Sequence, residues 1–252
     1  MSGNPFDLTG KVAIVTGANT GIGQAIALAL AQAGADIAAV GRTPAEETVA
    51  RARDLGRKAE MIAADLATIA PVQGVIDATL ARLGRLDILV NNAGIIRRAD
   101  AVDFTEADWD AVIDTNLKSV FFLCQAAGRH MIGQGACKII NIASLLSFQG
   151  GIRVPSYTAS KAGVAGLTKL LANEWAPKGV QVNGIAPGYV ATNNTTALQA
   201  DAVRNRAILD RIPAGRWGRP EDLGGAAVFL ASSASDYVTG HILAVDGGWL
   251  AR

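Results

Sequence analysis

A tyrosine and a lysine stand four residues apart in the segment Tyr157-Thr-Ala-Ser-Lys161. On a helix this spacing places both side chains on one face. A phenol has an ordinary pKa of about 10, too high for a base at neutral pH, and a neighbouring ammonium lowers that pKa. The pair is therefore a candidate for general acid–base catalysis. Taken alone, such a pair is more often a packed tyrosine beside a solvated lysine.

A serine precedes this pair at the end of the apolar segment Ile140-Asn-Ile-Ala-Ser144. Ligands of open α/β sheets bind at the carboxyl ends of the strands. A hydroxyl at that place could hold a substrate carbonyl or alcohol oxygen beside Tyr157. Together, Ser144, Tyr157 and Lys161 indicate chemistry on a carbonyl or alcohol group.

A glycine-rich turn near the start of the chain predicts a nucleotide site. The apolar run Val12–Thr16 leads into Gly17-Ala-Asn-Thr-Gly21-Ile-Gly23, and a helical pattern follows. Glycines at these positions permit a tight turn and let a pyrophosphate approach the helix N-terminus, where free amides favour phosphate. A glycine turn alone is a weak signal, but its place in the first strand–helix unit strengthens the prediction.

Short apolar runs along the chain are typical of strands that are covered on both faces. They are Val12–Thr16, Ile37–Val40, Glu60–Ala63, Ile88–Val90, Lys138–Ile142, Val180–Ile185 and Ile242–Val245. Helical patterns lie between them at Ala25–Ala33, Glu46–Leu55, Val72–Leu83 and Gly163–Trp175. This alternation predicts a single α/β domain over residues 1–252. We expect a Rossmann-type, doubly wound parallel sheet of about seven strands with helices on both faces.

Composition limits the classes of partner and the compartment. Half of the 252 residues are hydrophobic and the formal net charge is +1, so we expect neither nucleic acid nor a membrane as a partner. The start of the chain lacks the apolar core of a signal peptide. Cys124 lies in a helical pattern and Cys137 in a glycine-rich turn, without metal or redox spacing. We therefore expect a reduced, cytoplasmic protein without a metal site.

The spacing Gly17-x-x-x-Gly21-x-Gly23 resembles the short-chain dehydrogenase/reductase family, and further motifs agree in order. They are Asp65-Leu66 after the third strand, Asn91-Asn92-Ala-Gly94 after the fourth, Asn116, Ser144 with Tyr157 and Lys161, and Pro187-Gly188 after the sixth. The resemblance covers essentially the whole chain. It implies an NAD(P)-dependent oxidoreductase that passes a hydride between the nicotinamide and a substrate carbon.

The resemblance also implies roles for individual residues. Ser144 would position the substrate oxygen and Tyr157 would transfer the proton. Lys161 would tune Tyr157 and hold the nicotinamide ribose. Asn116 would fix a water that links Lys161 to solvent, unless it caps a neighbouring backbone group. The expected cofactor contacts are Gly17, Asn19, Thr20, Gly21, Ile22, Gly23, Arg42, Asp65, Leu66, Asn92, Gly94, Tyr157, Lys161, Pro187, Gly188, Val190 and Thr192.

The residues after the second strand bear on the choice of cofactor. An acidic residue there would accept hydrogen bonds from the ribose 2′-hydroxyl and repel a 2′-phosphate. Gly41 stands in that place, and Arg42 could pair with a 2′-phosphate. Arg42 could equally stack on adenine or be a solvated loop charge, and Thr20 is uncharged where many NADP-using relatives are basic. We expect NADP(H), with NAD(H) open.

Several segments resemble the sugar-acid branch of the family, namely residues 95–98, 139–157, 191–195, 211–218 and 246–252. A sugar acid needs a partner for its carboxylate and others for its hydroxyls. Arg98 and Arg153 could each fork a carboxylate, or could form a surface or subunit salt bridge. Gln149, Asn193 and Asn194 are candidate hydroxyl partners.

The segment 189–218 interrupts a strand-to-helix connection, and such long inserts often act as lids. We expect it to order over the substrate, with a permanently packed insert as the alternative. The resemblance implies a homotetramer. Residues 245–250 would suit a subunit contact, although Trp249 could pack within its own chain. Two other functions stay open: a 3-oxoacyl-thioester reductase and a non-enzymatic dinucleotide-sensing protein of the same fold.

Overall fold

The computed structural model describes residues 3–252, and its strands form one parallel sheet of seven. The strand order is β3-β2-β1-β4-β5-β6-β7. The strands are β1 (Val12–Thr16), β2 (Asp36–Gly41), β3 (Ala59–Ala63), β4 (Ile88–Asn91), β5 (Cys137–Ile142), β6 (Val180–Pro187) and β7 (Ile242–Val245). The direction of winding reverses between β1 and β4. The predicted doubly wound parallel sheet is therefore confirmed.

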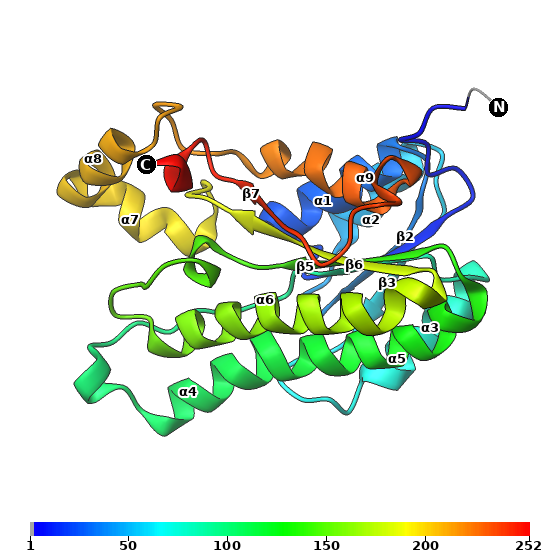
Figure 1. Cartoon of the computed structure of the whole chain (residues 1–252), viewed down its shortest axis with the longest axis horizontal. Coiled ribbons are helices and arrows are strands. Elements are labelled where there is room, and N and C mark those ends of the chain that lie inside the picture. The colour runs from blue at the N-terminus through cyan, green and yellow to red at the C-terminus, as the bar shows by residue number, and fades with distance from the viewer. Residues whose placement is uncertain (1–2) are drawn as a thin grey trace.

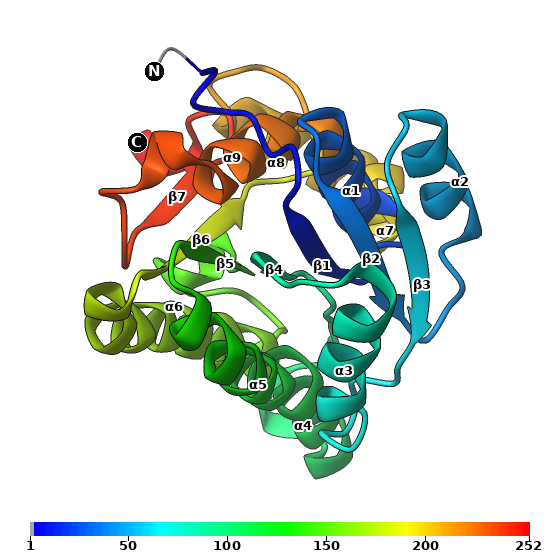
Figure 2. The ribbon, with the colours of Figure 1, turned by 90° about the vertical axis from the view of Figure 1, so that its right-hand side faces the viewer.

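Helices cover both faces of the sheet (Figures 1 and 2). One face carries α1 (Gly21–Gln32), α2 (Glu46–Asp54) and α9 (Gly224–Ala231), and the other carries α3 (Val72–Leu83), α4 (Glu106–Ile113), α5 (Ser119–Gln134) and α6 (Pro155–Trp175). The short helices α7 (Thr196–Ala200) and α8 (Ala202–Arg211) lie within the segment 189–218. Alternate residues of each strand enter opposite cores: Ile14 packs on the α3–α5–α6 side, whereas Ala13 and Val15 pack on the α1–α9 side.

Helix α6 begins at Pro155 and so includes Tyr157 and Lys161, whose spacing predicted a helix, ahead of the helical pattern Gly163–Trp175. Proline at the first position suits a helix start, because its missing N–H would have no partner there. The first turns of α6 carry polar residues, including Tyr157 and Lys161, so they lack the apolar period on which that pattern depends.

Both cysteines are buried, and Cys137 is the first residue of β5 rather than part of a turn. The turn itself is made by Gly135 and Ala136, which both have positive φ angles. Burial raises the pKa of the Cys124 thiol to about 12 and that of Cys137 to about 11. Neither thiol is therefore ionised at neutral pH.

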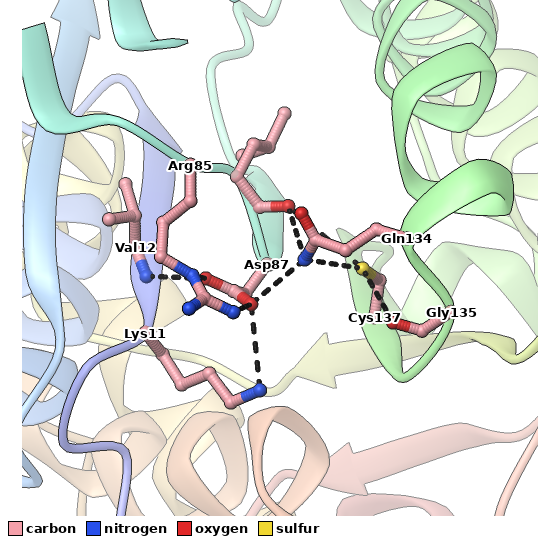
Figure 3. Close-up of polar contacts among 8 residues, drawn as sticks. Lys11, Val12, Arg85, Asp87, Gln134, Gly135 and Cys137 are labelled. Atoms are coloured by element: carbon pink, nitrogen blue, oxygen red, sulfur yellow. Dashed lines mark hydrogen bonds and ion pairs between the residues drawn. The ribbon is translucent and has the colours of Figure 1, made fainter.

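A buried carboxylate ties β1 to β4 at the amino-terminal edge of the sheet (Figure 3). The side chain of Asp87 is 1% exposed, and its oxygens accept hydrogen bonds from Val12 N at 2.9 Å, Arg85 Nε at 2.7 Å, Arg85 Nη2 at 2.6 Å and Gln134 Nε2 at 3.0 Å. Lys11 Nζ lies 3.5 Å away. Burial raises the pKa of Asp87, but the hydrogen bonds from Arg85 and Val12 and the nearby cations outweigh it, so the pKa lies below its ordinary value.

Within residues 3–252, no helix is long and apolar enough to cross a membrane. In the same range, no group of three or more His, Cys, Asp or Glu side chains could hold a metal ion.

Candidate active site

A cavity of about 680 Å³ opens at the carboxyl ends of the central strands. Its walls are the β1–α1 turn, the segment after β4, the end of β5, the first turns of α6 and the segment after β6. All of the predicted cofactor residues line this cavity except Arg42, Asp65 and Leu66. Ser144, Asn193 and Asn194 line it as well. The fold thus gathers residues from these five segments, together with Pro220 from a later one.

The turn between β1 and α1 is shaped by its glycines. Gly17 and Gly21 have φ angles of +66° and +58°, where a side chain is strained. A Cβ on Gly23 would lie 2.2 Å from the carbonyl oxygen of Gly17, so only glycine fits. Thr20 caps α1 without a side-chain hydrogen bond, and the first turn of the helix holds no acid. The first amides of α1 therefore fit the pyrophosphate of a dinucleotide.

The segment Asn91–Gly94 is anchored to β1 and β5 by its side chains. Asn92 Nδ2 donates to the carbonyl oxygen of Thr16 at 2.9 Å, and the hydroxyl of Thr16 accepts from Asn92 N at 2.9 Å. Asn91 Nδ2 donates to Asn141 Oδ1 at 2.8 Å. These bonds fix the floor of the cavity beside the glycine turn.

Ser144, Tyr157 and Lys161 meet at the end of β5. The hydroxyl of Ser144 accepts a hydrogen bond from Leu146 N at 3.2 Å and lies close enough to Tyr157 to lower the pKa of the phenol. Lys161 is buried, and its Nζ donates to the carbonyl oxygen of Ile142 at 2.6 Å. The same Nζ lies 5.7 Å from the centre of the Tyr157 ring. The pair therefore shares one face of α6, as its spacing predicted.

Burial and nearby groups act on the pKa values of Tyr157 and Lys161. Burial raises the pKa of Tyr157, while the hydroxyl of Ser144 and the charge of Arg98 act in the opposite direction. Burial lowers the pKa of Lys161 to about 8. The sequence assigned the lowering of the phenol pKa to Lys161, and that role stays a prediction; the charge of Arg98 acts in the same direction. The ammonium of Lys161 is bound to the carbonyl of Ile142.

Asn116 is buried in a π-helical turn, Asp114–Lys118, which joins α4 to α5. Its Oδ1 accepts from Ile95 N at 2.8 Å and its Nδ2 donates to Ile95 O at 2.8 Å. The side chain thereby pairs with both the N–H and the carbonyl of Ile95, which lines the cavity. This is the backbone-capping role that the sequence left open for Asn116. π-helical turns are frequent at functional sites. The water-holding role of Asn116 stays a prediction.

The candidate substrate residues divide into two groups. Asn193 and Asn194 line the cavity, and Arg98 Nη2 donates to the carbonyl oxygen of Asn194 at 3.2 Å. Arg153 does not line it; its Nε lies 3.0 Å from an oxygen of Asp100, and both side chains are exposed. Gln149 is also outside the lining, and its Oε1 accepts from Trp249 Nε1 at 3.3 Å. Arg153 and Gln149 are thus held by other side chains.

The three remaining cofactor candidates lie beside the glycine turn, at the ends of β2 and β3. Gly41 pairs with Ala63 in the sheet, so Arg42 and Asp65 follow neighbouring strands at the same edge. Arg42 is exposed, and Asp65 Oδ1 accepts from Ala67 N at 3.0 Å. Leu66 is buried in the core. An exposed Arg42 is accessible to the adenosine end of a dinucleotide.

Several lining residues were not identified from the sequence. They are Ala93, Ile95, Ile142, Ala143, Ala191, Thr195 and Pro220. Most of them flank a motif residue and present small or apolar surface, which carries no chemical signal of its own. Pro220 reaches the cavity only because the chain returns to it after the segment 189–218.

The matches to known proteins agree with this architecture. A family model described as enoyl-(acyl carrier protein) reductase matches residues 17–250. The chain belongs to the short-chain dehydrogenase/reductase family, whose members with this site are NAD(P)-dependent oxidoreductases.

Individual relatives narrow the comparison further. The chain is 61% identical over 248 residues to the 2-dehydro-3-deoxy-D-gluconate 5-dehydrogenase of Escherichia coli (strain K12), which covers 98% of both chains. The chain also matches the crystal structure of a protein from Agrobacterium tumefaciens that is assigned as a 2-deoxy-D-gluconate 3-dehydrogenase and that holds NADP. The TM-score is 0.93 and the identity 61%, and the match covers 99% of this chain and 100% of that one. A gluconate 5-dehydrogenase from Burkholderia cenocepacia J2315, in complex with NADP and tartrate, has a TM-score of 0.94 and 45% identity over 98% of both chains.

Proposed function

We propose that this protein transfers a hydride between NADP(H) and a hydroxyl or keto group of a sugar acid of the 2-dehydro-3-deoxy-D-gluconate type. The observation that carries the proposal is the placement of Ser144 and Tyr157 together at the cavity. Arg98, which donates to the backbone of the lining residue Asn194 at 3.2 Å, supplies a cation for a carboxylate at the rim. The full-length identity of 61% to the Escherichia coli enzyme supports the same substrate class.

The chemistry assigned to the side chains follows from their positions. When bound, the nicotinamide supplies or accepts the hydride. The hydroxyl of Ser144 orients the substrate oxygen beside Tyr157. Because burial holds the pKa of Tyr157 above its ordinary value, its phenol is protonated at neutral pH and donates that proton when a ketone is reduced. Lys161, whose pKa is about 8, carries a positive charge at neutral pH and holds the cofactor ribose in this proposal.

Replacing Arg98 tests the carboxylate partner. In Arg98→Met we expect the KM for the sugar acid to rise by about tenfold or more, because a hydrogen bond to a charged group is worth about 1.5–3 kcal/mol. The KM for NADPH should stay close to the wild-type value. The neighbouring Arg97 pairs with Asp108 away from the cavity lining, so Arg97→Met is the matched control. A sugar-acid KM that is equal in the two variants would contradict the assignment of Arg98.

Two alternatives can be separated from this proposal by one panel of substrates. The description of the matching family model favours a thioester substrate, so a 3-oxoacyl thioester is included beside keto-sugar acids, each with NADPH and NADH. Activity on thioesters alone would replace the sugar-acid proposal. Dinucleotide binding without turnover of any substrate would favour the sensing protein, although Tyr157, Lys161 and Ser144 are all in place at the cavity.

The preference for NADP(H) over NAD(H) depends on Arg42 in this proposal. The solved relatives from Agrobacterium tumefaciens and Burkholderia cenocepacia hold NADP, which supports it. In Arg42→Ala we expect the KM for NADPH to rise by about tenfold, since a charge-assisted hydrogen bond to the 2′-phosphate is lost. The KM for NADH should change little. Arg51, which pairs with Glu47 on the surface of α2, provides the control Arg51→Ala. An equal effect on both cofactors would mean that Arg42 does not read the 2′-phosphate.

We further propose that the segment 189–218 is a lid, because Asn193, Asn194 and Thr195 line the cavity and are followed by the peripheral helices α7 and α8 (Figure 1). The homotetramer and the cytoplasmic location stay predictions.

A further inference from the structure

Trp249 is a buried aromatic side chain that lies outside the active-site cavity. It is 5% exposed and follows β7 in the segment Asp246–Arg252, which we call the tail. The guanidinium carbon of Arg211 lies 4.0 Å from the centre of its ring, and the Tyr189 ring centre lies 4.7 Å away on tilted planes. Arg211 ends helix α8 of the lid, and Tyr189 begins the lid. The indole therefore packs against the start of the lid and against the end of its helix α8.

The same indole contacts the segment that carries Ser144. Trp249 forms a small apolar cluster with Leu145, Ile208 and Ile212. Leu145 directly follows Ser144, whereas Ile208 is the buried residue of α8. A shift of α8 in this cluster would consequently displace the residue next to the candidate catalytic serine, because packed side chains transmit such movements.

A polar contact strengthens this connection. Gln149, on the loop after Ser144, accepts hydrogen bonds at its Oε1 from Trp249 Nε1 at 3.3 Å and from Arg211 Nη2 at 3.5 Å. One amide oxygen thus joins the tail, the lid and the loop after β5. Gln149 was a candidate for a substrate hydroxyl, but its oxygen serves this junction instead.

The tail is itself fixed against the lid by its backbone. Asp246 accepts from Gly248 N at 2.8 Å and from Leu250 N at 2.9 Å, which closes the turn before Trp249. Ala214 N donates to Gly247 O at 3.0 Å. A Cβ on Gly248 would lie 2.9 Å from Pro213 Cγ, so the turn packs directly on the chain that leaves α8. The indole therefore has a rigid support.

We propose that Trp249 is a positioning residue that couples helix α8 of the lid to the Ser144 segment and so sets the affinity for the substrate. It acts through Leu145, Arg211 and Gln149, since it does not itself line the cavity. The inference rests on the proposed function for the choice of substrate and for the role of segment 189–218 as the lid.

Trp249→Phe tests the coupling, because it keeps an aromatic ring and removes the N–H that binds Gln149. We expect the KM for a keto-sugar acid to rise by about three- to tenfold, the range for one lost hydrogen bond. The Kd for NADPH and the Tm should stay near wild type. Trp109→Phe makes the same change on the exposed face of α4 and should leave all three values unchanged. Arg211→Met should raise the same KM, whereas Arg206→Met, at an exposed position of the same helix, should not.

A second measurement needs no substrate. Trypsin can cleave α8 after Arg204 and Arg206, and mass spectrometry measures the rate of this cleavage in the presence of NADPH. We expect the rate to be several-fold higher in Trp249→Phe than in the wild type or in Trp109→Phe. A wild-type rate of cleavage in Trp249→Phe overturns the proposal. A rise in the KM of Trp249→Phe that is accompanied by weaker NADPH binding and a lower Tm also overturns the proposal, because it indicates general destabilisation. If the wild type turns over no sugar acid, the proposed function fails, and the cleavage rate alone decides the role of Trp249.

Discussion

Replacing Tyr157 with phenylalanine is expected to lower kcat by about 10²- to 10⁴-fold, the usual contribution of a positioned acid–base group. The ring would remain in the cavity wall, and only the hydroxyl beside Ser144 would be lost. The glycine turn and the Asn92 anchor do not involve this hydroxyl, so the Kd for NADPH should change little. Steady-state kinetics together with a titration of NADPH fluorescence would measure both quantities.

Tyr237 provides the matched control for this experiment. It is fully exposed in the turn before β7, and Tyr237→Phe makes the same chemical change away from the cavity. It should leave kcat and the Kd for NADPH at their wild-type values. Wild-type turnover in Tyr157→Phe would exclude Tyr157 as the proton donor, and with it the proposed mechanism.

The second large effect is expected on stability, from Asp87→Asn. The change removes one acceptor oxygen from a buried site, and a buried donor left without its partner, such as Val12 N, costs about 1–3 kcal/mol, whereas the partly exposed Arg85 and Lys11 regain water. Here the carboxylate accepts from Arg85 and from the backbone of β1, with Lys11 nearby (Figure 3). Unfolding by urea at neutral pH would measure the loss. Asp77→Asn, at an exposed residue of α3 that bonds only to Gln73, is the control and should cost far less.

The pH dependence of this effect has a definite sign. The pKa of Asp87 is lowered in the folded protein from its ordinary value of 3.8, so its contribution to stability is fully present above that value. The contribution is lost as the pH falls through the folded pKa. The difference in unfolding free energy between the wild type and Asp87→Asn should therefore be constant near neutral pH and shrink below about pH 4. A difference that grows on acidification would contradict the ion-pair explanation.

The central strands were predictable because they are buried on both faces. The continuous apolar runs Val12–Thr16 and Ile88–Val90 therefore lie in β1 and β4. The edge strand β7 is only partly buried, yet the run Ile242–Val245 coincides with it. The apolar period alone located only Gly163–Trp175 within α6, since the residues of its first turns that face the cavity are polar, and the Tyr157–Lys161 spacing indicated the helix there instead. The π-helical turn at Asn116 likewise has no local signature, because it depends on the packing of α4 and α5 and on the bond to Ile95.

Contacts between side chains that are far apart in the sequence were the hardest feature to predict. Gln149 and Arg153 lie between Ser144 and Tyr157 in the chain, and this proximity suggested the substrate pocket. Their side chains are instead held by Trp249 and Asp100. The motif residues could be placed because strand ends meet at one edge of a parallel sheet. The direction of a loop side chain depends on contacts that no spacing rule supplies.

The two buried cysteines have a practical consequence. A protonated, inaccessible thiol reacts slowly with alkylating agents, because the thiolate is the nucleophile. Cys137 begins a central strand and Cys124 packs beneath it in α5, so a reagent reaches either sulfur only after the sheet has separated from its helices. The rate at which these thiols are alkylated would therefore report the rate of unfolding. The residues that line the active-site cavity include no cysteine or methionine, so the same reagent finds no sulfur there.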